Sequence, residues 1–471
     1  MKTATSTSLW GRLETWSSWA GALALVAIVA ACSNLLDVKN PNNVNEEDLS
    51  NPASAASQAN GVLSSLARAW GNILTPYAVA TDELTWIGSR DAWQNLDRGT
   101  LSEPTNEFVD AAFFYVGEAR WFADATIKRL NGFMAAGTLA DTSNLTRTYL
   151  YGALIYTAIG DFFDNFPIGS DKTTAAPPLG PANMGQVYDT AIAYATRGIT
   201  LAQKDSDKVG ELLLTAARAR AEHAKAVWAL FPHPALPSGP PANPLVNNAA
   251  ATADANATLA LGASLGLNTW LFRFAYSQQT VTTDIGFEVN EREEMRIGGG
   301  YVYPDCTESG CATGGKTVAV DSIKLKDPVD NKPDPYFAAV LAEFLGNTRY
   351  GPLTMLSARE MHLIVAEAAL AAGNTAGFTT AINNLRALSG GLTAYDPNNP
   401  AHPTPINLLK YERQANLFLQ GRRLADEYRF GVPADLWLPG KEATTTPVFL
   451  PITISERLAN SYCIADPNAC N

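Results

Sequence analysis

Apolar residues recur at helical spacing along most of this chain. Positions three or four residues apart are apolar while the intervening ones are polar, which is typical of amphipathic helices packed on a core. The expected helices cover residues 55–74, 104–135, 144–162, 183–204, 208–231, 252–264, 335–346, 356–373, 375–389 and 405–429. Many are rich in alanine, which lets neighbouring helices approach closely. The pattern predicts a mainly α fold built from helix pairs.

The clearest pair covers 356–388, where two helical segments meet at a turn formed by Gly373 and Asn374. Its length and its small residues at the helix crossing resemble a tetratricopeptide unit. A weaker second unit extends over 146–203 and is interrupted by an insertion. Two segments, 232–250 and 277–334, are rich in proline or glycine and predict loops and short β-hairpins. We expect a loop-rich insertion at about 232–334 on a helical scaffold.

The N-terminus has the pattern of an export signal. A basic start with Lys2 and Arg12 precedes an apolar run that ends at Ala31, too short for the roughly 20 residues of a membrane-spanning helix. Val-Ala-Ala before Cys32 matches the cleavage motif of a bacterial lipoprotein, whose cysteine receives acyl chains such as palmitate. We expect a signal peptide over 1–31, a lipidated tether over 32–56 and a helical domain over 57–471. An ordinary secretory signal with an incidental cysteine is the alternative.

The charge balance excludes two classes of partner. The 471-residue chain carries a net charge of −12, with 46% hydrophobic and 17% charged residues. Phosphate backbones and anionic lipids attract clustered lysine and arginine, so nucleic acid is not an expected partner. Membrane attachment must therefore come from the acyl chains on Cys32.

The other four cysteines fall into two close pairs, Cys306 with Cys311 and Cys463 with Cys470. In an exported protein both pairs can form local disulfides. A zinc site with four thiolates would need the pairs to converge, and their spacings are looser than usual for zinc ligands. We expect two disulfides and no metal.

A run of aromatic and polar residues follows the first helix. Aromatic faces stack on sugar rings, and short polar side chains bind hydroxyl or carbonyl groups. Tyr301 and Tyr303 would share one face of a strand and extend such a surface. The candidate ligand-binding residues are Asp82, Trp86, Arg90, Trp93, Asn95, Tyr301 and Tyr303. The alternative is that Trp86 and Trp93 pack in the hydrophobic core, and that the two tyrosines are ordinary half-buried strand residues.

Catalytic motifs are absent from the sequence. There is no H-E-x-x-H, no G-x-S-x-G and no phosphate-binding glycine loop, so no catalytic residue or cofactor is assigned. The charged cluster at 288–296 is interpreted as solvated, and Glu412, Arg413 and Arg423 as structural ion pairs. Paired carboxylates for glycoside hydrolysis stay open, because their spacing is set by the fold.

Several motifs, in this order along the chain, resemble the SusD/RagB family of outer-membrane nutrient-binding lipoproteins. They are Cys32 with Leu35-Leu36-Asp37-Val38 and Asn40-Pro41-Asn42, Gly160-Asp161-Phe162-Phe163 with Pro167, Arg359 with Ile364 to Glu367, Gly373-Asn374, Asn383 to Arg386, Glu412-Arg413 with Leu417, Gly421-Arg422-Arg423, and Phe449 to Ile452 with Glu456 and Asn460. Asn416 and Gln420 depart from residues common in the family, which are acidic. The resemblance covers nearly the whole mature chain.

The resemblance implies a scaffold of tetratricopeptide-like pairs and no enzymatic step. It implies a lipoprotein on the outer membrane, facing the exterior, that binds glycans or peptides and delivers them to a SusC-like TonB-dependent transporter. The run from Asp82 to Arg98 lies where family members often place binding residues. Two other functions stay open: a surface glycoside hydrolase or other carboxylate-dependent hydrolase, and a helical scaffold for protein partners.

Overall fold

The computed structural model describes residues 46–170, 174–233, 236, 238–303 and 322–471. The chain divides into two compact units, 1–54 and 55–471. The described part of the first unit contains α2 (Glu46–Leu49) and a 3-10 turn, Pro52–Ser54. The expected signal peptide, Cys32 and the Cys306/Cys311 pair lie outside the described residues.

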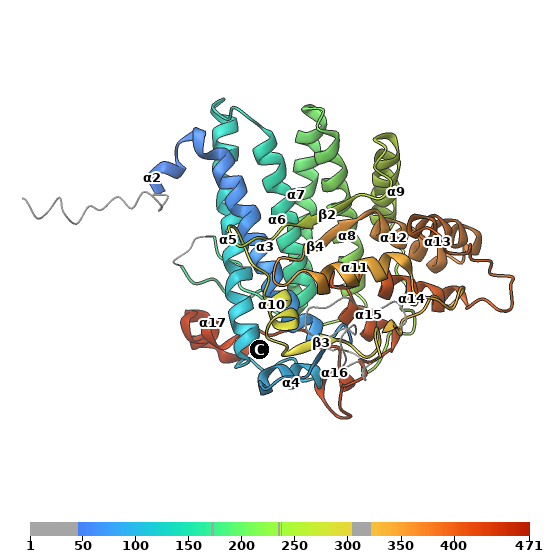
Figure 1. The fold of residues 1–471 in the computed structure, drawn as a ribbon. Helices are drawn as coiled ribbons and strands as arrows, with labels where there is room; N and C mark the ends of the chain where they lie inside the picture. The colour runs from blue at the N-terminus through green and yellow to red at the C-terminus, as the bar shows by residue number, and fades with distance from the viewer. Residues whose placement is uncertain (1–45, 171–173, 234–235, 237, 304–321) are drawn as a thin grey trace, which may run out of the picture. The chain divides into compact units, whose positions relative to one another are not determined.

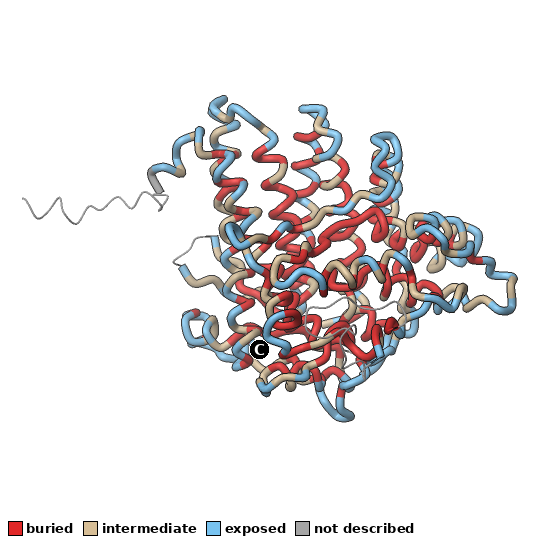
Figure 2. Tube along the Cα trace, viewed as in Figure 1, coloured by how far each residue is buried: buried red, intermediate tan, exposed pale blue. Residues whose placement is uncertain are grey.

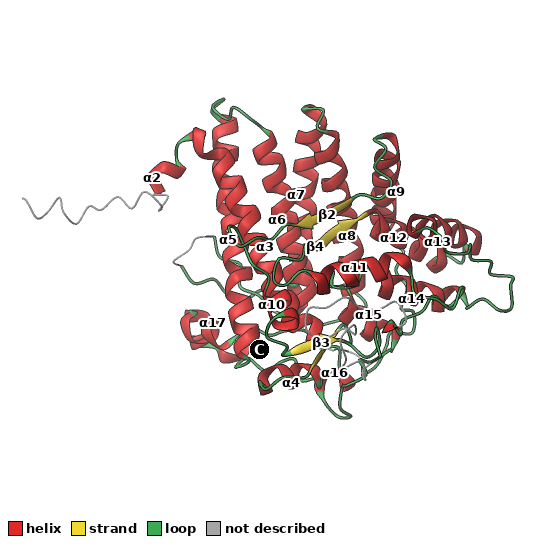
Figure 3. Ribbon diagram, viewed as in Figure 1, coloured by secondary structure: helices red, strands yellow, loops and turns green. Residues whose placement is uncertain are grey.

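The second unit is mainly helical, which confirms the expected fold class (Figure 3). Its helices are α3 (Ala55–Val79), α4 (Asp91–Asp97), α5 (Glu107–Ala135), α6 (Ser143–Phe162), α7 (Gly185–Lys204), α8 (Lys208–Trp228), α9 (Ala249–Ser264), α10 (Asp284–Asn290), α11 (Pro335–Gly346), α12 (Ala358–Ala371), α13 (Thr375–Ser389), α14 (Pro405–Asn416), α15 (Arg423–Phe430), α16 (Glu442–Thr445), α17 (Ile454–Ala459) and α18 (Ser461–Ala465). Among the described residues, no helix combines the length and the hydropathy needed to cross a bilayer.

The long helices α3 and α5 to α9 stand side by side, and each packs on its neighbour along the chain (Figure 1). Their facing sides are buried, while the tips of several of them are exposed (Figure 2). Small residues allow the close crossings: a Cβ atom at Gly152 of α6 would lie 2.8 Å from the ring of Tyr194 on α7. The alanine- and glycine-rich pattern thus sets how closely the helices pack.

The helix pair expected over 356–388 is formed by α12 and α13. Ser357 caps α12 by accepting a hydrogen bond from the backbone N–H of Glu360 at 3.1 Å. Gly373 has φ of +71°, which ends α12 in a conformation that glycine adopts without strain. Asn374 then caps α13 by accepting from the N–H of Gly377 at 2.9 Å. Capping residues therefore define both helices, as the sequence indicates.

The prediction of a single helix over 405–429 is wrong, because the helix is interrupted between α14 and α15. Leu419 has φ of +53° and Gly421 has φ of +69°, so neither residue continues a helix. A Cβ atom at Gly421 would lie 2.7 Å from the ring of Phe162. The break lets the backbone approach the aromatic core formed by Phe162 and Trp70, whose ring centroids lie 5.4 Å apart.

Two short antiparallel ribbons join distant segments: β1 (Leu84–Trp86) pairs with β3 (Met295–Ile297), and β2 (Leu271–Phe274) pairs with β4 (Leu353–Ser357). Trp86 is opposite Met295 in the first ribbon. The aromatic run after the first helix is thereby tied to the 277–334 segment.

Buried ion pairs hold the C-terminal helices, as expected for Glu412, Arg413 and Arg423. Arg386 donates to Glu412 at 2.8 Å, and Arg413 donates to Asp426 at 2.8 Å. Arg423 pairs with Asp82, 341 residues away in sequence. These contacts between buried charges link α13, α14 and α15 to the start of β1.

The solvated interpretation of the charged cluster at 288–296 is wrong for two of its members. Glu288 and Glu294 are buried. Burial raises the pKa of Glu288 to about 7. Burial also acts to raise the pKa of Glu294, but hydrogen bonds from Ser89 and from the N–H of Arg90 bring it below its ordinary value. Glu294 therefore serves as an acceptor that fixes the turn after β1.

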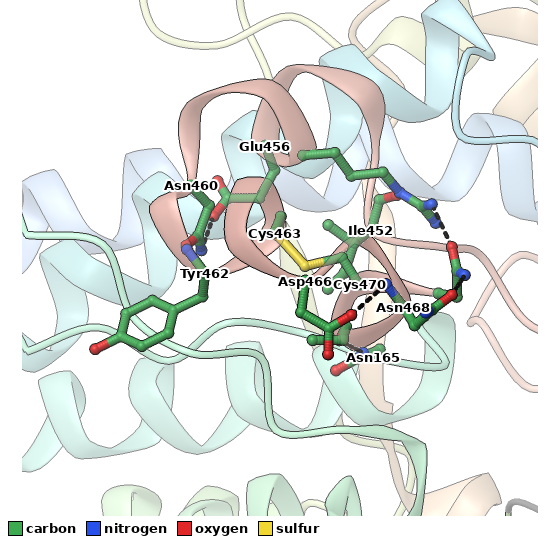
Figure 4. The surroundings of a disulfide bond; sticks show 12 residues. Asn165, Ile452, Glu456, Asn460, Tyr462, Cys463, Asp466, Asn468 and Cys470 are labelled. Atoms are coloured by element: carbon green, nitrogen blue, oxygen red, sulfur yellow. Dashed lines mark hydrogen bonds between the residues drawn. A yellow bond between two sulfur atoms is a disulfide. The ribbon is translucent and has the colours of Figure 1, made fainter.

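The C-terminus is closed by a disulfide between Cys463 and Cys470, whose Cα atoms lie 5.5 Å apart (Figure 4). Both cysteines are buried. Asn165 donates a hydrogen bond to the carbonyl of Ala469 at 3.0 Å, which ties the closed loop to the segment after α6. The second of the two expected cysteine pairs is thus a disulfide in this fold.

Candidate functional site

A cleft lies between α3, α5 and the segment that leads into α10. Its volume is about 690 Å3, within the range of about 300 to 1,000 Å3 typical of small-ligand pockets. We call it the first cleft and define it by Arg68 and Asn72 on α3, Tyr115, Glu118, Trp121 and Phe122 on α5, and Thr283, Asp284, Phe287 and Arg349 opposite.

One wall of the first cleft is aromatic. Tyr115 and Phe122 are seven residues apart on α5, so both side chains project from one face of the helix, and Trp121 projects from the adjoining face, about 100° from Phe122. The rings of Trp121 and Phe122 are inclined by only 15°, with centroids 6.4 Å apart. Gly61 on α3 leaves room for Phe122, because a Cβ atom there would lie 2.8 Å from its ring. All three aromatic residues are half-buried, so they are held firmly and still reach the cleft.

Charged and amide groups line the same wall. Arg68 forms an ion pair with Glu118, and its guanidinium lies 4.7 Å from the ring centroid of Tyr115. Asn72 donates to the backbone carbonyl of Arg68 at 2.8 Å, which leaves its amide oxygen available as an acceptor. The first cleft thus offers hydrogen-bond donors and acceptors beside its aromatic faces.

The opposite wall is built around the start of α10. The hydroxyl of Thr283 caps this helix by accepting from the N–H of Gly286 at 3.2 Å. The guanidinium of Arg349 lies 4.5 Å from the ring centroid of Phe287 and donates to Glu291 at 2.8 Å. Burial raises the pKa of Asp284, the first residue of α10. This wall therefore adds a second aromatic ring and a fixed cation.

The first cleft is suited to binding a polar ligand with flat apolar faces. Aromatic rings stack on such faces, and Arg68, Asn72 and Arg349 can bind hydroxyl or carbonyl oxygens. Among the residues that the structure describes, no group of three or more His, Cys, Asp or Glu side chains is placed to bind a metal ion. The arrangement can bind a ligand through aromatic stacking and hydrogen bonds.

Three of the sequence candidates lie in the interior: Asp82, Trp93 and Tyr301. Trp93 is 0% exposed, and its ring stacks on Phe108 with centroids 3.6 Å apart. Asp82 is buried and accepts two hydrogen bonds from Arg423, at 2.6 and 2.5 Å. For Trp93 the structure therefore agrees with the alternative left open by the sequence, in which the ring packs in the core, because no face of the ring reaches solvent.

Glu83, beside Asp82, gives a pH-dependent prediction. Burial raises its pKa from 4.5 to about 8, although its carboxylate accepts from the N–H of Leu419 at 2.7 Å. The folded state then binds a proton more tightly than the unfolded state, so ionisation destabilises the fold as the pH rises from about 4.5 to about 8. Glu83→Gln is expected to gain stability relative to wild type progressively across this window, because the amide cannot ionise. Urea denaturation at several pH values measures this, and parallel stability curves for the two proteins would contradict it.

Trp86, Arg90 and Asn95 are half-buried in a separate region around β1 and α4. The Arg90 guanidinium lies 5.3 Å from the ring centroid of Phe108, and Asn95 donates to Glu103 at 3.2 Å. The α4 helix here was not expected from the sequence. These three residues do not line the first cleft.

Tyr301 and Tyr303 do not form a shared aromatic face. Tyr301 is 0% exposed and packs on Phe337 and Phe418, whereas Tyr303 is 43% exposed. Only Val302 between them forms a β-bridge, with Ile323. The tyrosines therefore occupy different environments, one in the core and one at the surface.

The residues of the first cleft were not among the sequence candidates. The sequence predicts a helix over 104–135, which carries the aromatic residues Tyr115, Trp121 and Phe122. None of these aromatic residues was a candidate for ligand binding. A signal was present, because Phe114-Tyr115 and Trp121-Phe122 are adjacent aromatic pairs on an amphipathic helix. Adjacent positions point in directions about 100° apart, so one narrow core stripe does not accommodate both members of each pair.

No protein-family model and no curated protein sequence matches the chain. Solved structures do. A SusD homologue from Bacteroides thetaiotaomicron aligns with a TM-score of 0.57 at 13% identity, covering 89% of this chain and 98% of the other. A SusD superfamily protein from Bacteroides fragilis gives 0.56 at 13% identity, with coverage of 88% and 98%. A laminarin-binding SusD-like protein gives 0.54 at 14% identity, with coverage of 87% and 98%. The resemblance seen in the sequence is confirmed at the level of the fold, and the chain has the SusD-like fold.

Proposed function

We propose that this protein captures an oligosaccharide in the first cleft. The observation that carries the proposal is the clustering of Tyr115, Trp121 and Phe122 beside Arg68 and Asn72 in a cleft of about 690 Å3. Sugar rings present apolar C–H faces to aromatic side chains and hydroxyl groups to polar ones. The cleft offers both kinds of contact on one wall.

Structures with the same fold favour a glycan over a peptide as the ligand. One is described as a SusD-like carbohydrate-binding protein from Bacteroides vulgatus, and another as laminarin-binding. Within the first cleft the positive charge of Arg68 is balanced by its ion pair with Glu118. The cleft therefore has no excess charge from this pair that would attract a strongly charged peptide. Neutral or weakly charged glycans fit this balance best.

We further propose that the protein works as a lipid-anchored module on the outer membrane and passes its ligand to a SusC-like TonB-dependent transporter. The motif before Cys32 and the order of family-like motifs support this role. A net charge of −12 gives the protein no attraction to anionic lipid, so the anchor alone would hold it at the membrane. Tethering raises the local concentration of the partner, so tight ligand binding is not needed.

Replacing Cys32 with serine tests the anchor. The variant is expected to appear in the soluble fraction with unchanged folding and glycan binding, because acylation needs the thiol. Fractionation and pull-down of the transporter from native membranes measure the two parts of the role. A Cys32→Ser protein that stays in the membrane fraction would contradict the anchor.

Glycan capture itself is tested by calorimetry on the chain from residue 33. Laminarin, starch, xylan and mannan are titrated in turn, and at least one is expected to bind with a Kd between about 1 μM and 1 mM, as suits a ligand that must be released. The bound glycan is expected to be recovered uncut, as judged by its reducing ends. Absence of binding to every glycan, with binding to a peptide library instead, would overturn the glycan assignment.

A further inference from the structure

A second cleft lies across α5 from the first. Its volume is about 470 Å3, again within the range of small-ligand pockets. We define it by Phe114 and Gly117 on α5, Phe166 and Pro167 after α6, and Glu456 and Asn460 near the C-terminus. Glu118 and Trp121 line both clefts. The two clefts therefore adjoin at one stretch of α5.

The shared stretch of α5 carries a line of side chains that spans the boundary. Phe114, Glu118 and Trp121 follow the i, i+4, i+7 pattern, so they lie on one face of the helix over a length of about 10 Å. Phe114 is 65% exposed, and no other phenylalanine or tryptophan among the described residues is exposed. Its ring centroid lies 5.5 Å from that of Tyr115, a residue of the first cleft. Aromatic contacts thus continue from one cleft into the other.

The far wall of the second cleft is fixed by hydrogen bonds and by the disulfide. Asn460 donates to Glu456 and to the carbonyl of Ala176, both at 2.8 Å. Cys463, three residues further on, is joined to Cys470, so the chain is also held directly after Asn460 (Figure 4). A wall built in this way needs little ordering when a ligand binds.

We infer that the two clefts form one binding site for an extended glycan chain, which crosses α5 over Trp121 and Phe114. The inference rests on the proposed function and deepens it: the ligand class becomes a linear polysaccharide rather than a single sugar or disaccharide. A short fragment fills the first cleft alone. A longer chain reaches Phe114 and gains an additional stacking contact.

The inference is tested with oligosaccharides of two to ten sugar units cut from laminarin, starch, xylan and mannan. For the glycan that binds, affinity is expected to rise by about tenfold between the shortest and the longest fragments, the gain expected of one added aromatic contact. In Phe114→Ala this gain is expected to vanish, while the affinity for the shortest bound fragment stays unchanged. Tyr303→Ala, which removes an exposed ring outside both clefts, is the matched control and should behave as wild type.

Each outcome separates this inference from the proposed function. Equal affinity for short and long fragments, or a Phe114→Ala variant that keeps the length dependence, would overturn the extended site while capture in the first cleft stands. Absence of binding at every length would overturn both. A Phe114→Ala variant that changes only the oligomeric state, measured by light scattering, would assign the second cleft to contact between protein chains and also overturn the inference.

Discussion

Glu367→Ala is expected to lower the free energy of unfolding by about 4 kcal/mol, because it leaves buried positive charge without a partner. Glu367 is 0% exposed and lies between the guanidinium groups of Arg413 and Arg429. One of its oxygens also contacts Nε2 of His223 at 3.1 Å, and the other accepts from the N–H of Val246 at 3.1 Å. The carboxylate therefore joins α12 to α8, α14 and α15 in one interaction.

The matched control for this prediction is Glu211→Ala. Glu211 also forms an ion pair, with Lys208 at 2.8 Å, but at the surface of α8. Such pairs contribute at most about 1 kcal/mol, because solvent screens them. Urea denaturation followed by circular dichroism measures both variants. Equal losses in the two proteins would show that the buried network does not hold the C-terminal helices.

Trp121→Ala is expected to weaken glycan binding by roughly 30-fold, the effect of losing a central aromatic contact worth about 2 kcal/mol. Trp121 lines both clefts, so the loss should appear with short and long fragments alike. This distinguishes it from Phe114, whose loss affects long fragments only. Calorimetry with the glycan that binds wild type gives the ratio of the two Kd values.

Trp86→Ala serves as the matched control. Trp86 is half-buried like Trp121, but it lies on β1 in the region that holds most of the candidate ligand-binding residues named from the sequence. A normal Kd for Trp86→Ala and a weakened one for Trp121→Ala would place the ligand on α5. The reverse result would place it on the run from Asp82 to Arg98 and overturn the choice of cleft.

The helices could be predicted from the sequence where local signals define them. The boundaries expected for α11 and α13 match the structure, because Asp334 and Asn374 cap their starts and Gly390, with φ of +69°, follows the end of α13. The break between α14 and α15 could not be predicted in this way. It depends on a positive φ at Leu419 and on the ring of Phe162, which is distant in sequence.

The candidate site was harder to predict, because burial is decided by tertiary packing. Trp93 and Trp121 both lie in stretches with aromatic and polar neighbours, yet one stacks on Phe108 in the core and the other lines a cleft. The sequence likewise predicts that Glu288 and Glu294 are surface charges, whereas both are buried in the structure. Only the packing of α3, α5 and α10 against one another shows which side chains remain accessible.

The central claim is that a glycan binds on the aromatic face of α5. A crystal structure of the chain from residue 33 with the best-binding oligosaccharide tests it most directly. We expect a sugar ring against Trp121, with hydroxyl groups hydrogen-bonded to Arg68 or Asn72, and in longer fragments a second ring beside Phe114. A sugar bound beside Trp86 and Arg90, with the first cleft empty, would contradict the account.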